Sequence, residues 1–233
     1  MSQLTYSRSQ AEAVDEGASR GAGRRTSGDG SVQRVMKRVL DVVLASVGLV
    51  VFGPAMLFTA LLIWQSGGPA LYRQERIGIN GRRFMCLKFR TMVVDAEERL
   101  AEYLANNEEA AREWRETHKL RNDPRVTRLG RFLRKSSIDE LPQLINVLRG
   151  EMSIVGPRPI VQAEVEKYGE HFAAYASVPP GLTGLWQICG RSDTAYPERV
   201  RLDVMYVENW SLLGDIMIIF RTIPAVLRAR GAT

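Results

Sequence analysis

The sequence is poor in the residues on which several large enzyme classes depend. Its 233 residues include two cysteines, Cys86 and Cys189, and two histidines, His118 and His171. The cysteine spacing matches no zinc site or redox motif, which fits a reduced, cytoplasmic setting. No HExxH pattern, glycine-rich dinucleotide motif or P-loop is present. These absences argue against zinc chemistry, histidine-based catalysis and the common nucleotide-binding folds.

Charge and apolar residues are both unevenly distributed. Lys and Arg number 32 against 26 Asp and Glu, a net charge of +6, which suits phosphates, nucleic acid or an anionic membrane surface. Residues 1–33 are rich in Ser, Gly, Ala and Arg and poor in large apolar side chains. We therefore predict a disordered basic tail there, since such a segment cannot bury enough surface to offset its ordering.

One long apolar run does occur, at residues 42–64, and it contains no charged residue. It exceeds the ~20 residues that a helix needs to cross a bilayer core. The pair Gly53 and Pro54 interrupts its centre, and basic residues flank both ends: Arg34, Lys37 and Arg38 before it, and Arg73, Arg76, Arg82 and Arg83 after it. Because positive flanks favour the cytoplasmic side, we expect a re-entrant helix over residues 34–66. A single kinked span is the alternative, which proline also permits.

An adjacent acidic pair, Asp139 and Glu140, stands at the start of a second apolar pattern. Ser137 and Glu140 fit the S-x-x-E capping box of a helix N-terminus. The face that follows has helical spacing: Leu141, Leu144, Ile145 and Leu148. Pro142 suits a first helical position, which would move the start later, and Gly150 is a typical stop. The pair is therefore expected at a helix N-terminus, as a cap, a reaction centre or both.

The surroundings of this pair favour phosphate chemistry. A carboxylate is a competent nucleophile toward phosphorus, provided that the phosphate charge is neutralised. Arg158 lies between Pro157 and Pro159, which restrict the backbone and hold a planar guanidinium suited to two-point phosphate contacts. Further positive charge is available from Arg134, Lys88 and Arg90. Mg²⁺ would suit a diphosphate substrate.

Three other segments have recognisable patterns. Residues 72–92 read as a hairpin whose second strand is residues 86–92. Residues 95–120 predict a charged helix with a solvated face. Residues 209–230 are apolar with basic residues near the end, typical of a helix that packs on the core or lies in a membrane interface.

Taken together, the ordered motifs resemble one family, the bacterial sugar transferases, which are monotopic polyprenyl-phosphate phosphoglycosyl transferases. The motifs are KRVLD (37–41), ALYRQERIGINGRRF (70–84), KFRTM (88–92), the run from DPRVTRLGRF to GPRP (123–159), PGLTGLWQICGR (180–191) and DVMYVENWSLLGDI (203–216). The length and the insert around Trp114 are most similar to members that start exopolysaccharide assembly with galactose-1-phosphate.

The resemblance implies a reaction and a set of residues. The family transfers a sugar-1-phosphate from a UDP-sugar to undecaprenyl phosphate and releases UMP. It implies Asp139 as the covalent nucleophile, Glu140 as its catalytic partner, and a required Mg²⁺ with both as ligands. The expected substrate-binding residues are Arg158, Arg134, Lys88, Arg90, Arg76, Pro157 and Arg191. The family breaks its re-entrant helix at a Ser-Pro pair, whereas this chain has Gly53 and Pro54.

The fold expected is α+β and helix-rich, with a cytoplasmic catalytic domain over residues 67–233 that has a small β-hairpin and interfacial helices. The expected location is the bacterial inner membrane, with lipid as a partner, no nucleic acid, and a homodimer left open. Three rival interpretations remain: a glucose or N-acetylated sugar donor, a non-catalytic membrane assembly factor, and a nucleic-acid binder. Retention of the acidic pair and Arg158 argues against the second, and the lack of a binding motif argues against the third.

Overall fold

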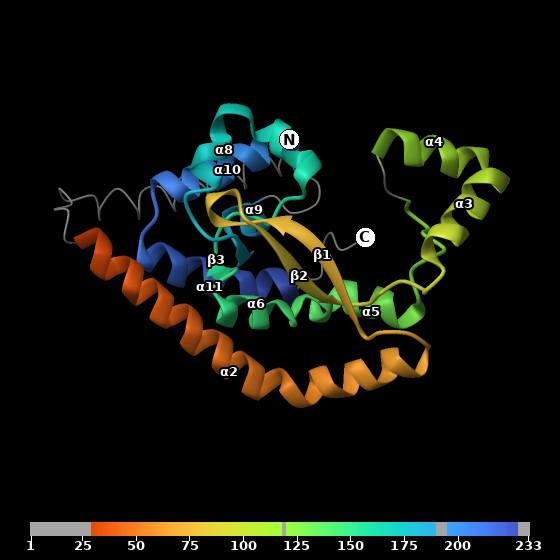
Figure 1. Cartoon of the computed structure of the whole chain (residues 1–233), viewed down its shortest axis with the longest axis horizontal. Coiled ribbons are helices and arrows are strands. Elements are labelled where there is room, and N and C mark those ends of the chain that lie inside the picture. The colour runs from red at the N-terminus through yellow and green to blue at the C-terminus, as the bar shows by residue number, and fades with distance from the viewer. Residues whose placement is uncertain (1–28, 118–119, 190–194, 228–233) are drawn as a thin grey trace.

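A computed structural model describes residues 29–117, 120–189 and 195–227 of the chain (Figure 1). Residues 1–28 of the predicted tail, His118 and Arg191 lie outside these residues, whereas residues 29–33, predicted as part of the tail, are helical. The strands and helices are α2 (Asp29–Gln65), β1 (Leu71–Ile77), β2 (Arg83–Phe89), α3 (Ala96–Asn106), α4 (Glu108–Thr117), α5 (Arg128–Ser136), α6 (Gln143–Arg149), β3 (Ser153–Val155), α7 (Val165–Tyr168), α8 (Phe172–Tyr175), β4 (Gly181–Thr183), α9 (Leu185–Cys189), α10 (Tyr196–Glu208) and α11 (Leu212–Leu227). Short 3-10 turns occupy Ile79–Gly81, Ile138–Glu140, Gln162–Glu164 and Gly169–His171.

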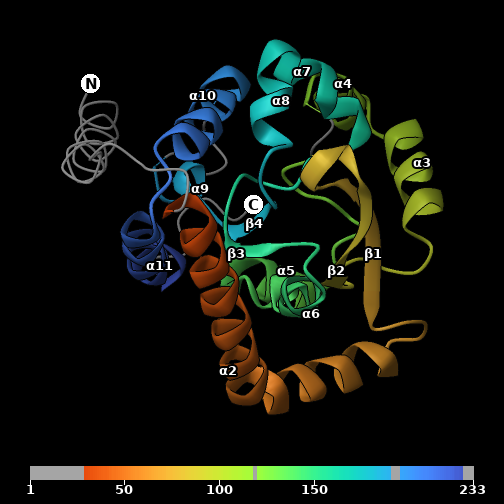
Figure 2. The ribbon, with the colours of Figure 1, turned by 60° about the vertical axis from the view of Figure 1, so that its left-hand side comes forward.

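Helix α2 is one continuous 37-residue helix with Pro54 inside it. It bends part-way along and follows the body of the molecule rather than leaving it (Figure 2). Proline removes a backbone hydrogen bond without ending the helix, which accounts for a bend of this kind. The inner side packs on the body, where Ala45 and Ile63 are buried. Among the described residues, Ser31–Gln65 is the one helix that is long and apolar enough to cross a membrane.

The predicted hairpin is confirmed, with its second strand beginning earlier than expected. Strands β1 and β2 are antiparallel and pair from Leu71 with Phe89 to Ile77 with Arg83. The turn is tight because Asn80 adopts a left-handed conformation, φ 56°, which asparagine tolerates better than most residues. The second strand therefore starts at Arg83 rather than at Cys86.

The capping box predicted for the acidic pair is wrong. Ser137 ends helix α5 in a left-handed conformation, φ 58°, and its side chain caps nothing. A capping serine needs an extended backbone, so this geometry precludes that role. Asp139 and Glu140 instead form a 3-10 turn ahead of α6, which begins at Gln143 and ends, as predicted, at a left-handed Gly150.

A second small sheet was not predicted from the sequence. Strands β3 and β4 pair in parallel, Ser153 with Gly181 and Val155 with Thr183. A Cβ atom on Gly181 would lie 2.1 Å from the backbone nitrogen of Gly156, so the two chains approach at a distance that only glycine allows. This sheet places the GPRP segment beside the PGLTGLWQ segment.

Helix α11 packs on this sheet, and helices α7, α8 and α10 pack together around a second buried cluster. The largest cluster of buried residues joins α2, β2, α6, β3, α9, α10 and α11: Ala45, Phe84, Cys86, Leu144, Val147, Met152, Ile154, Val155, Leu185, Trp186, Leu202, Tyr206 and Ile218. The β2 contribution lies against α6, where the buried Asn146 accepts a hydrogen bond from the Leu87 backbone N–H at 3.0 Å.

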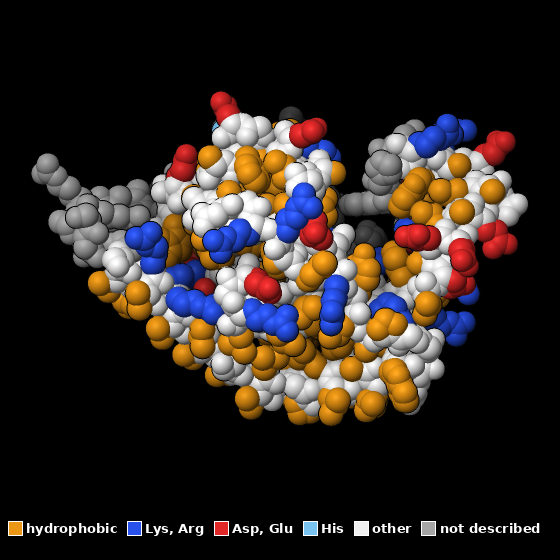
Figure 3. All heavy atoms as spheres, in the orientation of Figure 1, with side chains coloured by type: hydrophobic (Ala, Val, Ile, Leu, Met, Phe, Trp, Pro, Cys, Tyr) orange, Lys and Arg blue, Asp and Glu red, His pale blue; other side chains and the backbone are white. Residues whose placement is uncertain are grey.

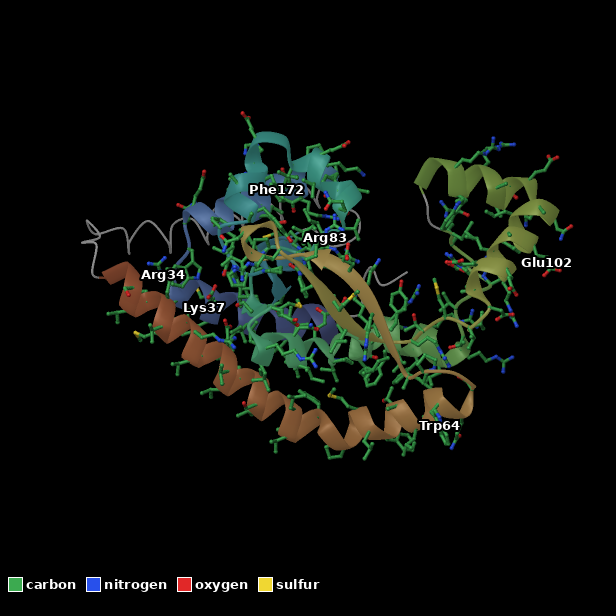
Figure 4. The ribbon with its side chains drawn as sticks, viewed as in Figure 1. Arg34, Lys37, Trp64, Arg83, Glu102 and Phe172 are labelled. Atoms are coloured by element: carbon green, nitrogen blue, oxygen red, sulfur yellow. The ribbon has the colours of Figure 1, made fainter. Side chains whose placement is uncertain are left out.

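The charged helix predicted for residues 95–120 is two helices. Asn107, with an extended backbone, separates α3 from α4, and its side chain accepts a hydrogen bond from the Ala110 N–H. That local cap competes with helix continuation. The pair projects from the body, with Glu102 on its outer side (Figure 4).

Apolar and basic side chains occupy adjacent zones of the surface. Hydrophobic atoms cover the lower rim formed by α2, and Lys and Arg side chains lie in a band immediately above it (Figure 3). The exposed apolar residues of the neighbouring helices are Phe132 on α5, Leu148 on α6, and Leu213, Phe220 and Ile223 on α11. An apolar face bordered by positive charge is typical of a protein that sits in a membrane interface.

Candidate active site

Strand β2 and the 3-10 turn bring a lysine to the acidic pair. Lys88 Nζ donates to Glu140 Oε1 at 2.6 Å, and the two side chains are only 22% and 33% exposed. Burial raises the pKa of Glu140, but the charges of Lys88 and Arg158 outweigh this effect and hold that pKa below its usual value. Glu140 is therefore an ionised carboxylate engaged by a cation.

Asp139 has a different environment from its neighbour. Burial raises its pKa to about 6, and the negative charge of Glu140 acts in the same direction. The positive charges of Lys88 and Arg134 oppose that rise. Asp139 is thus charged at neutral pH but poorly solvated and without a strong ionic partner, which is the state expected of a carboxylate available for attack.

A small, partly open polar pocket lies beside Glu140. It is lined by Arg76, Cys86, Lys88, Glu140, Gln143, Arg158, Pro159, Gly181, Leu182 and Gln187. Three of these side chains are cations and one is the acidic residue they face. A cavity of this charge, closed on one side by Gly181 and Leu182 of β4, suits a phosphorylated ligand.

Arg158 lines this pocket, and its guanidinium group forms no ion pair with any described residue. Its Cζ atom lies 5.1 Å from the centre of the Trp186 ring. Within the described ranges it makes no side-chain hydrogen bond. Its donors therefore remain available for phosphate oxygens.

Arg76 and Arg134 are both anchored, unlike Arg158. Arg76 donates to the Pro159 carbonyl at 3.0 Å and to Gln74, and burial together with the charge of Arg158 lowers its pKa. Arg134 donates from Nε to Thr91 Oγ1 at 2.9 Å. Arg76 lines the pocket, whereas Arg134 lies outside its lining and acts on the charge of Asp139.

Two further predicted site residues have structural contacts of their own. Arg90 donates to the Ile63 and Gly67 carbonyls and to Ser66 Oγ at the end of α2, and it does not line the pocket. Pro157 is buried, and its carbonyl accepts from Gly181 N at 2.8 Å, which ties GPRP to β4. Arg191, also predicted, lies outside the described residues.

Sequence reasoning missed a buried network that joins helix α2 to the start of β3. Asp41 accepts from Ser153 Oγ at 3.1 Å and Ile154 N at 3.0 Å, where β3 begins. Lys37 joins Asp41 and Asp215, each at 3.0 Å, and lies at the start of α2 (Figure 4). The quoted motifs contained these residues, but their sequence positions gave no sign that they meet.

The acidic pair fits a magnesium ion only together with substrate. The described residues hold no group of three His, Cys, Asp or Glu side chains able to surround a metal. Mg²⁺ commonly binds through one or two carboxylates plus substrate phosphates. Asp139 and Glu140 beside a cationic pocket are consistent with that arrangement.

Comparison with known proteins decides the family. The sequence model described as "Bacterial sugar transferase" matches residues 32–229. The chain belongs to the bacterial sugar transferase family. This confirms the resemblance carried by the motifs, and the match spans α2, the pocket and α11 together.

Several relatives of this sugar transferase have names that state a function. The chain is 53% identical over 197 residues to "Exopolysaccharide production protein ExoY" of Rhizobium meliloti, covering 84% of this chain and 87% of that protein. It is 49% identical over 199 residues to the "Undecaprenyl-phosphate galactose phosphotransferase" of Salmonella typhimurium, covering 85% of this chain but only 42% of that longer protein. It is 43% identical over 205 residues to the "UDP-glucose:undecaprenyl-phosphate glucose-1-phosphate transferase" of Caulobacter vibrioides, covering 84% and 71%.

Proposed function

We propose that this chain transfers a sugar-1-phosphate from a UDP-sugar to undecaprenyl phosphate, releasing UMP, as the first step of exopolysaccharide repeat-unit assembly. The observation that carries the proposal is the cationic pocket beside Asp139 and Glu140, in which Arg158 has no side-chain hydrogen bond among the described residues. The names of the relatives supply the substrate class.

In the first half-reaction, a carboxylate oxygen of Asp139 attacks the phosphorus that bears the sugar. The bond between that phosphorus and the bridging oxygen breaks, and UMP leaves with the electron pair. Arg158, Lys88 and Arg76 neutralise the diphosphate charge that would otherwise repel the carboxylate. Mg²⁺, when bound by the acidic pair and the diphosphate, would add Lewis-acid neutralisation.

In the second half-reaction, a phosphate oxygen of undecaprenyl phosphate attacks the same phosphorus of the phospho-sugar enzyme. The bond to Asp139 breaks, and the carboxylate is regenerated. This order requires the lipid phosphate to reach the site from the membrane. The apolar face over α2 and the basic band beside it support such an approach (Figure 3).

Galactose is the donor sugar that we propose. The Salmonella relative with galactose in its name is 49% identical, and the Caulobacter relative with glucose in its name is 43% identical. Glucose and N-acetylated sugars remain the alternatives to be tested in the same assay.

We further propose that the protein acts at the cytoplasmic face of the bacterial inner membrane, with α2 entering and leaving the same leaflet. The bend of α2, the basic flanks and the packing of both its halves on the body support this topology (Figure 2). The arrangement would keep the pocket where UDP-sugars are available.

The decisive assay supplies the purified protein with undecaprenyl phosphate, Mg²⁺ and radiolabelled UDP-galactose, UDP-glucose or UDP-N-acetylgalactosamine in separate reactions. We expect label in the lipid fraction and UMP in solution, with UDP-galactose preferred. Without the lipid acceptor, intact-mass measurement should detect one sugar-phosphate on the protein. Absence of labelled lipid with every donor would favour a non-catalytic assembly factor instead.

A further inference from the structure

The indole of Trp186 contacts two arginines from different parts of the chain. Arg158, in the GPRP segment, places its Cζ 5.1 Å from the ring centre. Arg199, on α10, places its Cζ 4.6 Å from the same centre. Trp186 itself is 5% exposed and fixed within the main core cluster. The ring is therefore a rigid surface against which both guanidinium groups lie.

Two cations on one ring repel each other unless the surroundings compensate. Cation–π attraction supplies part of the compensation, and it is strongest where water is excluded. Asp203, 1% exposed on α10, lies close enough to both arginines that their positive charges oppose the rise that burial causes in its pKa. The hydroxyl of Tyr168 donates to Asp203 Oδ2 at 2.7 Å and fixes that carboxyl.

Several buried polar atoms around this ring have no hydrogen-bond partner in the part of the chain that the structure describes. They are Trp186 Nε1, Tyr196 Oη, Arg199 Nε and Asp203 Oδ1. Buried polar atoms are normally paired, so a group of unpaired ones calls for an explanation. The Asp203 carboxyl is under the influence of both the backbone N–H and the charge of Arg158, so this polar group belongs to the surroundings of Arg158.

The GPRP backbone alone does not fix the Arg158 side chain. Pro157 and Pro159 restrict the main chain, but the long side chain retains its rotamer freedom. No described side chain hydrogen-bonds its guanidinium group. Among the described residues, the contact with the Trp186 ring is the side-chain contact of the guanidinium group, and it leaves the N–H groups unoccupied.

We propose that Trp186 and Arg199 are positioning residues that act through Arg158. The indole face orients the guanidinium plane toward the donor diphosphate, and Arg199 closes the ring from α10 so that Arg158 cannot turn away. This inference rests on the proposed role of Arg158 in binding the donor. It predicts that removing the Trp186 ring weakens the binding of the UDP-sugar donor and leaves the binding of the lipid acceptor unchanged.

Steady-state kinetics with UDP-galactose and undecaprenyl phosphate test the first part. Trp186→Leu should lower kcat/KM for the donor about ten- to thirtyfold, the range expected for a desolvated cation–π contact. Trp186→Phe keeps an aromatic face and should retain most of the activity. Because the two half-reactions are separate, kcat/KM for the lipid acceptor should stay unchanged in both variants. Equal losses in Trp186→Phe and Trp186→Leu, or a lowered kcat/KM for the acceptor, would overturn the proposal.

A double-mutant cycle tests whether Trp186 acts through Arg158. Calorimetric binding of UDP is measured for the wild type, Arg158→Gln, Trp186→Leu and the double variant. If the ring serves only to position Arg158, Trp186→Leu should weaken UDP binding in the wild type and cause no further loss beside Arg158→Gln. If the loss of UDP affinity in the double variant equals the product of the two single losses, Trp186 acts independently of Arg158, and the inference is overturned.

Arg199 offers a route that does not disturb the core. Arg199→Gln should reproduce part of the donor effect, and Arg199→Lys should restore much of it because the positive charge is kept. Arg201→Gln is the matched control, since Arg201 lies on the same helix and pairs with Glu198 at the surface.

Thermal unfolding shows whether Trp186→Leu is folded. If it is not, the same double-mutant cycle is measured with Arg199→Gln and Arg158→Gln, and its result tests the positioning role. Failure of the wild type to release UMP in spite of UDP binding would count against the proposed function rather than against this positioning role.

Discussion

Asp139 and Glu140 occupy one turn of chain but two electrostatic environments. Glu140 meets Lys88 at 2.6 Å, and its pKa is lowered, whereas burial raises the pKa of Asp139 to about 6. The consequence is a division of roles: one carboxylate is held by a cation, and the other remains reactive. Adjacent residues can differ in this way because successive side chains of a turn point in different directions.

The Asp139→Asn variant should abolish UMP release while the protein still folds. The amide keeps the shape of the side chain but lacks the negative charge required for attack on phosphorus. UMP production and the sugar-phosphate adduct in intact-mass spectra are the measurements. Glu170→Gln, at an exposed carboxylate far from the pocket lining, is the control. Substantial turnover by purified Asp139→Asn would rule out the nucleophile assignment.

Arg158→Lys should lose most of the activity in spite of its retained charge. Lysine cannot make the planar two-point contact, and it cannot lie flat against Trp186. Removing one preorganised donor from a transition state commonly costs about 3 kcal/mol, so we expect roughly a hundredfold loss in kcat. Near wild-type kinetics would show that Arg158 acts only as a point charge.

Asp203 should make stability depend on pH. Burial raises its pKa to about 7, so the folded state keeps a proton that the unfolded state releases near pH 4. The stabilisation is therefore complete below the unfolded pKa and is lost as the pH rises through 7. Between pH 5 and pH 8 the wild type should lose about 2 kcal/mol of unfolding free energy relative to Asp203→Asn.

Chemical denaturation of both proteins across this range measures the difference, and the asparagine can still accept from Tyr168. Parallel stability curves for the two proteins would show that Asp203 keeps the same charge in both states.

Among the helices and strands, α2 has a bend that a single substitution should remove. Pro54→Leu restores the missing hydrogen bond, and an uninterrupted apolar helix of about 23 residues is long enough to cross the bilayer core. We expect a fraction of molecules to adopt a spanning form, with the N-terminus outside and activity reduced.

Cysteine labelling by an impermeant reagent in intact cells reads this topology. The reporter is Ser31→Cys in a variant in which Cys86 and Cys189 are replaced by alanine. With Pro54 retained, the reporter should be protected, and with Pro54→Leu it should become accessible. Labelling from the periplasm while Pro54 is present would establish a true span.

The elements that were predictable are those with local signals. The apolar run gave α2, the alternation and the turn at Asn80 gave the hairpin, and Gly150 gave the end of α6. The parallel pair β3–β4 was missed because each strand has three residues and the pairing is between distant segments. The capping box failed because the left-handed Ser137 belongs to the preceding helix, a fact that depends on where α5 ends.

The residues of the candidate site also differ in how far the sequence alone could predict their positions. Lys88, Glu140 and Arg158 do line or border one pocket, as their chemistry predicted. Arg90 carries the same charge but caps α2 instead, since composition cannot tell a phosphate ligand from a helix-end ligand. The role of Trp186 against Arg158 required the fold, because no motif spacing relates a ring to a guanidinium from another segment.

For the whole molecule, α2 is part of the catalytic body and not an attached anchor. Arg38 donates to the Val147 and Leu148 carbonyls at the end of α6, at 2.6 and 2.9 Å, and Asp41 satisfies the start of β3. Removing α2 would leave the buried Ile154 N–H without its Asp41 acceptor, which costs about 1–3 kcal/mol, and would free the Val147 and Leu148 carbonyls. The helices and strands around the pocket would lose their packing surface as well.

A chain that begins at Gly67 should therefore show no cooperative thermal transition, even in detergent. The total of unpaired groups and lost apolar burial exceeds the margin of a typical domain. A chain that lacks only residues 1–28 keeps every contact described here and should unfold cooperatively. Circular dichroism during heating compares the two. A stable, folded fragment without α2 would show that the helix serves only to attach the protein to lipid.

The hydrogen bond between Asp41 and Ser153 can form only after both residues have been synthesised. The two residues are 112 positions apart, and chains grow at about 5–20 residues per second, so α2 exists for roughly 10 s before β3 is made. During that interval the Asp41 carboxylate has Lys37, one turn away, as its companion. A charged pair resists transfer into hydrocarbon, so the first turns of the nascent helix should stay at the water's edge. The depth to which this protein enters the bilayer is then set before its active site has been translated.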